Sequence, residues 1–191
     1  MIKTRIGNRN DIDDVLALQE RYLFRNLSEI ERKEGFVTTP FTVSQIEEII
    51  LQNGLILAVN ENDVIIAYAF AGSWEYFEQW DLFKHMISRF PKMSFNGSKI
   101  TTENSFQYGP VCIDKEYRGK GVLNLIFEEM RLEFLKKYPI SITFINKINA
   151  ISEKAHTKKL GWEILGEFEF NNNTYIELAF DMKKSVLKYI D

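Results

Sequence analysis

A basic turn with two glycines, Arg118-Gly119-Lys120-Gly121, holds the residues best suited to chemistry. An apolar segment at 106–113 precedes it as a predicted strand, and apolar residues at helical spacing follow over 122–135. The first amides of a helix lack intrahelical partners and can bind phosphate oxygens, helped by the helix dipole. The pattern therefore predicts a phosphate-binding turn. The alternative is a tight turn with exposed basic residues, and neither a Walker A nor a dinucleotide fingerprint is present.

A second group of polar residues follows another predicted strand at 140–145. Asn149, Ser152 and His156 stand on a predicted helix over 149–160, which ends at Leu160-Gly161-Trp162. Asn149 can cap this helix, and Gly161 can supply the left-handed residue at its end. Both residues therefore also have an explanation that needs no ligand.

Other elements must position these two groups. Period-two alternation predicts strands and helical spacing predicts helices, with turn residues between them. The predicted strands are 2–6, 55–59, 64–71, 162–170 and 174–180, and the predicted helices are 12–23, a stretch after Pro40, an aromatic-rich segment within 74–90 and a short one at 182–190.

Composition narrows the class of protein. The chain has 191 residues, of which 45% are hydrophobic and 27% charged, as in one soluble globular domain. A net charge of -3 argues against nucleic acid as the main partner, because phosphate neutralisation needs clustered excess Lys and Arg. Cys112 is the only cysteine and the two histidines lie far apart, so no metal site is expected and Cys112 is interpreted as a small core residue.

The chain also lacks the sequence signals of secretion and of the membrane. Its first residues contain no apolar segment typical of a secretory signal, and no stretch reaches the ~20 apolar residues that span a bilayer. We therefore expect a cytoplasmic protein without a membrane partner.

Together the two groups of residues resemble the motifs of the GNAT superfamily of acetyl-CoA-dependent N-acetyltransferases. Arg118 to Gly121 is similar to the start of the pyrophosphate signature, Gln/Arg-x-x-Gly-x-Gly/Ala, and Asn149 to Trp162 resembles the second motif. Leu123 stands where the signature ends in Gly or Ala. One extra lysine in Thr157-Lys158-Lys159 lengthens the second motif by one residue.

The resemblance covers nearly the whole chain and implies its fold. We expect one α/β (α+β) domain over residues 1–191, with an aromatic-rich insertion at about 74–104. Its sheet would be mixed, mostly antiparallel and twisted, with a central parallel pair of strands splayed around CoA and helices on both faces.

The resemblance also implies how acetyl-CoA, the cosubstrate, would bind without a metal. Arg118 would add charge beside the pyrophosphate, pantetheine would pair with the main chain at Ile113, and the backbone amide of Val111 would hydrogen-bond the thioester oxygen. Asn149 and Ser152 would bind the coenzyme from the second motif. The pyrophosphate would rest on the amides of Gly119, Lys120, Gly121, Val122, Leu123 and Asn124.

Proton transfer sets a further requirement. An alkylamine with a pKa of about 10.4 must lose a proton before it attacks, which costs about 4.6 kcal/mol at pH 7. Some superfamily members use a glutamate, but Gln107 stands at the matching position, so we expect a water chain, with Tyr108 or Glu103 as weaker candidates. His156 replaces the usual tyrosine that protonates the leaving thiolate, and a solvated helix histidine is the alternative.

The resulting hypothesis is an acyltransferase that moves acetyl from acetyl-CoA to a primary amine by direct attack in a ternary complex. Leu123 and Gln107 motivate an alternative, a non-catalytic CoA-binding or interaction module of the same fold. Trp74, Tyr76 and Trp80 are candidates to line the acceptor site, with core packing as their alternative. Homodimers are common in the superfamily, so the resemblance makes a second copy of this chain a candidate partner.

Overall fold

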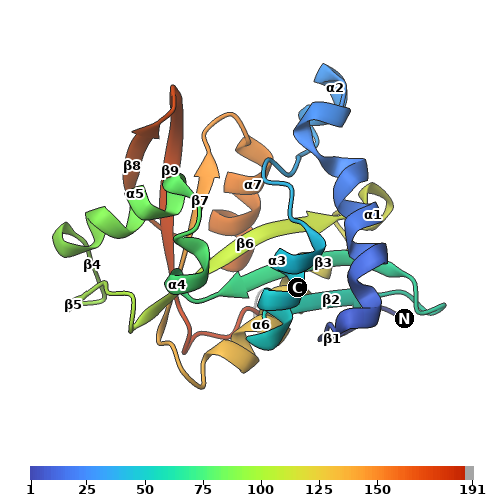
Figure 1. The fold of residues 1–191 in the computed structure, drawn as a ribbon, viewed down its shortest axis with the longest axis horizontal. Coiled ribbons are helices and arrows are strands. Elements are labelled where there is room, and N and C mark those ends of the chain that lie inside the picture. Colours follow the sequence, from blue (N-terminus) through green and yellow to red (C-terminus); the bar gives the residue numbers. More distant parts are fainter. Residues whose placement is uncertain (188–191) are drawn as a thin grey trace. The chain divides into compact units, whose positions relative to one another are not determined.

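A seven-stranded mixed sheet organises the computed structural model, which describes residues 1–187 (Figure 1). The strand order is β1-β2-β3-β6-β7-β9-β8, and β4 and β5 form a separate two-stranded hairpin. β6 and β7 pair in parallel, whereas β1 with β2, β2 with β3, β7 with β9 and β8 with β9 pair antiparallel. The predicted fold class, mostly antiparallel with one parallel pair, is confirmed.

The elements follow the predicted order closely. The helices are α1 Ile12–Tyr22, α2 Glu29–Arg32, α3 Val43–Leu51, α4 Trp74–Phe77, α5 Asp81–Arg89, α6 Val122–Phe134 and α7 Ala150–Lys154. The strands are β1 Lys3–Ile6, β2 Leu55–Val59, β3 Ile65–Gly72, β4 Ser94–Phe95, β5 Ser98–Lys99, β6 Ser105–Ile113, β7 Ile140–Asn146, β8 Glu163–Phe170 and β9 Asn173–Asp181.

Two predicted helices differ in the structure. The aromatic segment is divided into α4 and α5, because Trp80 adopts extended dihedral angles and caps the second helix. Residues 182–186 form turns and bends instead of a helix, since the Asp181 carboxylate accepts the amide of Lys183 and so favours a turn. Leu187 has 3-10 helical geometry. The remainder of that predicted helix, residues 188–190, lies outside the described residues.

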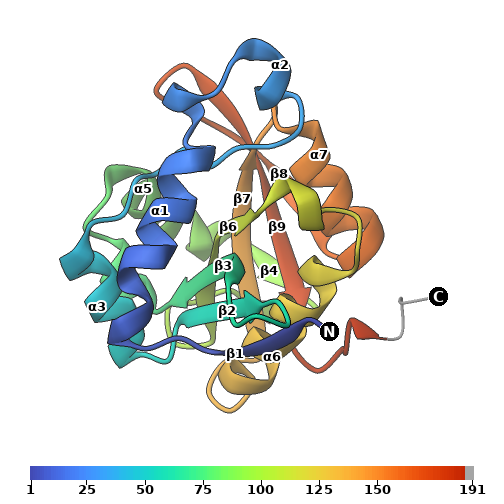
Figure 2. The ribbon, with the colours of Figure 1, turned by 90° about the vertical axis from the view of Figure 1, so that its right-hand side faces the viewer.

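Tertiary contacts group the chain into two compact units, and β6 passes from one to the other after Tyr108. The first unit comprises residues 1–71, 109–133 and the described part of 186–191. Within it, α1 and α3 cover one face of β1, β2 and β3, and α6 covers the opposite face (Figure 2). Ile126, Phe127 and Met130 of α6 are fully buried.

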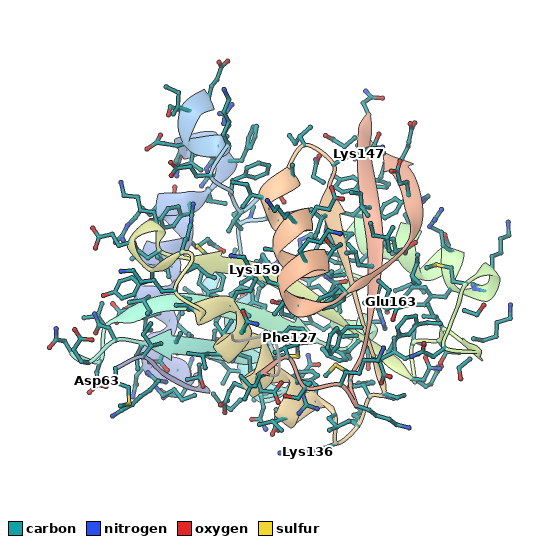
Figure 3. The ribbon with its side chains drawn as sticks, turned by 180° about the vertical axis from the view of Figure 1, so that it is seen from behind. Asp63, Phe127, Lys136, Lys147, Lys159 and Glu163 are labelled. Carbon is teal, nitrogen blue, oxygen red and sulfur yellow. The ribbon has the colours of Figure 1, made fainter. Side chains whose placement is uncertain are left out.

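The second unit comprises Gly72–Tyr108 and Phe134–Ser185. α4 and α5 lie on one face of its strands and α7 on the other (Figures 1 and 3). Trp74 is 1% exposed and donates from Nε1 to Ser105 Oγ at 3.0 Å, which fixes α4 onto β6. On the opposite face Tyr108 stacks on Trp162 with 5.4 Å between ring centroids. The prediction of one domain is not tested by this grouping and stays a prediction.

The extra lysine of the second motif has a structural counterpart. Residues Ala155–Leu160, directly after α7, form a π-helical segment, whose hydrogen bonds span five residues instead of four. Gly161 then ends the helix in the left-handed conformation with φ of 79°, and Leu160 and Trp162 on either side are buried. The wider turn therefore absorbs one residue and keeps the predicted helix end.

Among residues 1–187, no helix has the length and apolarity needed to cross a membrane.

Gly54 provides a test of the packing in the first unit. A Cβ atom at Gly54 would overlap the carbonyl oxygen of Ala71, where the turn after α3 meets the end of β3. We expect Gly54→Ala to lower the free energy of unfolding by roughly 1–3 kcal/mol, as other overpacked sites do. Urea denaturation measures the loss. Gly166→Ala is the control, because a Cβ there meets nothing within 4 Å. Equal denaturation midpoints for the two variants would contradict the packing.

Candidate functional site

The basic turn keeps both glycines in a conformation that favours glycine. Gly119 and Gly121 have φ of 76° and 78°, and a Cβ built on either one meets nothing within 4 Å. The carbonyl of Gly121 accepts the amides of Asn124 and Leu125, so it is the first acceptor of α6. The backbone amides that precede Asn124 therefore lie before the first intrahelical hydrogen bond of α6. An anion can approach the backbone here without meeting a side chain.

Arg118 has a different setting from the one predicted for a phosphate ligand. Its Nε donates to the Ile113 carbonyl at 2.9 Å, and its Nη1 donates to the Glu34 carbonyl at 2.7 Å. The guanidinium also lies 4.8 Å from the centroid of the Tyr22 ring. Arg118 thus fastens the turn to the end of β6 and to the segment after α2. Lys120, by contrast, is exposed at the turn.

The other predicted coenzyme residues of the first unit lie on β6 and α6. Val111 and Ile113 are half-buried and alternate with Cys112, which is 3% exposed. Burial raises the pKa of the Cys112 thiol to about 12, which fits a core residue and not a nucleophile. On α6, Val122 and Asn124 are buried and Leu123 is half-buried, so any contact with a ligand there falls to the backbone.

In the second unit the parallel pairing of β6 with β7 ends early. The register runs from Ser105 opposite Ile140 to Gln107 opposite Ile142. At the next position two side chains bind the Tyr108 carbonyl: Thr143 Oγ1 donates at 2.6 Å and Gln107 Nε2 at 2.7 Å. β7 continues to Asn146 paired only with β9 within this unit. The parallel pairing within this unit therefore covers only the first three residues of β6.

Asn149 and Ser152 begin α7 as the local prediction required. Asn149 Oδ1 accepts the Ser152 amide at 3.2 Å and caps the helix. Within the described part of the chain, Asn149 Nδ2 takes part in no hydrogen bond, so it retains two donors for a ligand. The Ser152 carbonyl accepts from the ring of His156.

His156 is buried, so the alternative of a solvated ring is wrong. It is 6% exposed, and its Nδ1 lies 2.8 Å from the Ser152 carbonyl oxygen. A carbonyl only accepts, so Nδ1 carries the proton and Nε2 of the neutral ring carries the lone pair. Burial lowers the pKa of His156 to about 4, and the Ser152 hydrogen bond opposes this shift. Near neutral pH the ring is therefore uncharged, and its Nε2 can accept a hydrogen bond. This protonation state disfavours the predicted role as an acid.

Neither side-chain candidate for the general base has a suitable setting. Burial raises the pKa of Tyr108, which is fully buried, so its phenolate does not form near neutral pH. Hydrogen bonds from Thr101 and Thr102 lower the pKa of Glu103, which is exposed to solvent. The expected water chain therefore stays as the prediction for deprotonation.

The structure resembles solved acetyltransferases over nearly its full length. A GNAT-family acetyltransferase from Streptococcus agalactiae matches with a TM-score of 0.63 and 15% identity, covering 94% of this chain and 95% of that one. The chain has the GNAT fold. An N-acetyltransferase from Staphylococcus aureus matches with a TM-score of 0.60 and 15% identity, covering 95% of this chain and 99% of that one. A GNAT superfamily phosphinothricin acetyltransferase from Sinorhizobium meliloti was solved with acetyl-CoA. It matches with a TM-score of 0.61 and 14% identity, covering 94% of this chain and 88% of that one. No protein-family profile matches the sequence, and no curated protein matches it either.

The aromatic segment consists mainly of core residues. Trp74 and Tyr76 are buried, and Trp74 is bound to Ser105, so neither presents its ring to a ligand. Trp80 is half-buried and packs against Phe77 and Phe83. Of the three residues predicted to line an acceptor, Trp80 alone is not classed as buried.

Sequence reasoning missed a buried ion pair on the face that α4 and α5 cover. Glu177 of β9 has no exposed side-chain surface, and its Oε2 lies 3.2 Å from Nη2 of Arg89. A single acidic residue within the apolar run 176–180 was the available signal, because charged residues are seldom fully buried. Among residues 1–187, no group of three or more His, Cys, Asp or Glu side chains could hold a metal.

The setting of His156 predicts a defined pH dependence of stability. The folded ring, with a pKa of about 4, binds fewer protons than the unfolded one, with a pKa of about 6.5. Its contribution is therefore complete above pH 6.5 and is lost as the pH falls toward 4, by about 3 kcal/mol in all. We expect urea denaturation to show this extra loss for the parent relative to His156→Gln.

Nitrogen-detected NMR gives an independent check. The sequence has two histidines, so His85→Gln assigns the His156 signals. They should show a neutral ring protonated at Nδ1 at pH 6. An imidazolium at that pH, or parallel stability curves for parent and His156→Gln, would contradict the buried neutral ring.

Proposed function

We propose that this protein transfers an acetyl group from acetyl-CoA to a primary amine. The observation that carries the proposal is the open turn of left-handed glycines, Gly119 and Gly121, at the start of α6 in a GNAT fold. The turn offers unobstructed backbone amides at the positive end of a 13-residue helix. Such a site suits the pyrophosphate of a coenzyme better than it suits an uncharged ligand.

Several backbone groups would hold the coenzyme. The amides from Gly119 to Leu123 would bind the pyrophosphate, and exposed Lys120 would add a positive charge. The Asn124 amide, which was predicted to belong to this group, already donates to the Gly121 carbonyl. Arg118 would act as a positioning residue, because its hydrogen bonds to Ile113 and Glu34 hold the turn in place. On β6, the amide of Val111 would donate to the thioester oxygen, while the Ile113 carbonyl keeps one lone pair beyond its bond to Arg118.

The second motif would contribute side-chain donors and an acceptor. Asn149 Nδ2 would donate to the pantetheine arm, and Ser152 would bind the coenzyme from the same motif. His156 would accept a hydrogen bond at Nε2, because the neutral ring has its lone pair there. The proton that the leaving thiolate needs would then come from solvent.

The acceptor reaction distinguishes this proposal from the alternative, a CoA-binding module without turnover. Gln107 supports the alternative, since an amide at this position cannot accept a proton from the amine. Thiol release from acetyl-CoA in the presence of a panel of primary amines is the direct test. Amine-dependent thiol release supports the enzyme. CoA binding without thiol release for any amine supports the module. The proposal includes a cytoplasmic location and a homodimer, and sedimentation tests the latter.

A matched pair of glycine substitutions tests the phosphate-binding turn. Gly121 and Gly97 have φ of 78° and 77°, and a Cβ on either one meets nothing within 4 Å. Alanine should therefore cost each site about the same backbone strain, roughly 1 kcal/mol. Only Gly121→Ala should weaken CoA binding, by tenfold or more, because its methyl group occupies the approach to the backbone. Calorimetric titration with CoA measures this, and equal affinities would contradict the assignment.

A further inference from the structure

The face of the second unit beneath α5 carries a row of three residues on adjacent strands. Phe144 of β7 lies opposite Glu177 of β9, and Glu177 lies opposite Gly166 of β8. Residues opposite one another in an antiparallel pair project to the same face of the sheet. The Glu177 carboxylate is therefore flanked by an aromatic ring on one side and by a residue without a side chain on the other.

The space beside Glu177 is open on the side of Gly166. A Cβ built on Gly166 meets nothing within 4 Å, and its backbone has no left-handed φ that would require glycine. Aromatic side chains lie beside this position on the same face of the sheet. Phe144 and Phe168 both contact Tyr175, with ring centroids 5.4 and 5.3 Å apart.

The carboxylate of Glu177 is only half satisfied. Nε and Nη2 of Arg89 both donate to Oε2, at 3.4 and 3.2 Å, which are long distances for a charged pair. Oε1 is buried and has no hydrogen-bond partner among the described residues. A buried, unsatisfied acceptor is costly, and functional sites are one of the places where such groups are retained.

Arg89 contacts the carboxylate and is itself partly exposed to solvent. Its side chain is 32% exposed, donates to the Glu167 carbonyl at 3.3 Å and lies 5.2 Å from the Phe168 ring centroid. A long side chain at this exposure can turn toward solvent without disturbing the core. Gln107 Oε1, a second buried acceptor without a partner among residues 1–187, lies on the same face of the sheet.

We propose that this face binds the ammonium group of the acceptor amine, with Glu177 as its anion and the rings of Phe144 and Phe168 beside its carbon body. An ammonium group supplies three donors and no acceptor, which complements a carboxylate with one oxygen unsatisfied. Aromatic faces attract cations, and the apolar body of the amine would fill the space over Gly166. The inference rests on the proposed acetyltransferase function and adds a site for its second substrate.

Benzylamine and benzyl alcohol form a matched pair of probes, since they share a ring and differ in charge. NMR titration at pH 7 without acetyl-CoA would follow the Gly166 amide and the Arg89 Nε–H. We expect benzylamine to shift both signals and benzyl alcohol to bind at least tenfold more weakly. Glu177→Gln should weaken benzylamine binding tenfold or more, whereas Glu169→Gln, an exposed residue of the same hairpin, should leave it unchanged.

Gly166→Val keeps the test decisive if Glu177→Gln does not fold. Valine suits a strand, retains the carboxylate and fills the space, so it should abolish benzylamine binding in a folded protein. Equal binding of the amine and the alcohol, no binding of either, or undiminished benzylamine binding by Gly166→Val would overturn the site. These measurements need no turnover, so a failure of acetyl transfer is recognised separately. Conversely, an active Glu177→Gln enzyme with unchanged amine KM would overturn only this site.

Discussion

A buried carbonyl that loses its partner in a β-ladder must find another donor, and at Tyr108 two side chains supply one. Thr143 and Gln107 both donate to this oxygen where the parallel register of β6 and β7 stops. A Gln or Thr side chain can end a ladder without an unsatisfied group, whereas an apolar residue cannot. The Tyr108 carbonyl therefore stays satisfied at the point where the parallel register ends.

Burial decides the chemistry of most titratable groups near the motifs. Desolvation raises the pKa of Tyr108 and Cys112 and lowers that of His156, so each group is held in its neutral form near pH 7. Burial likewise raises the pKa of Glu177, and the neighbouring Arg89 guanidinium opposes this shift.

Local patterns predicted the order of elements, the glycine turn before α6 and the capping of α7, because each depends on residues close in the sequence. The setting of Arg118 could not be predicted in this way, since its partner Glu34 lies 84 residues away. Burial of His156 was equally hidden, because it depends on packing against Tyr108 and Trp162. The division of the aromatic segment into α4 and α5 depends on the backbone of one residue, Trp80, whose type does not favour a break.

The π-helical segment after α7 has a consequence for the direction in which side chains point. Each residue of an α-helix advances the chain by about 100° around its axis, so one added residue would rotate everything after it by that angle. A regular helix would then turn Leu160 away from the core and bring a lysine toward it. The wider turn cancels this rotation locally. Lys158 and Lys159 both remain exposed while Leu160 stays buried, and the direction of the chain into β8 does not depend on the added residue.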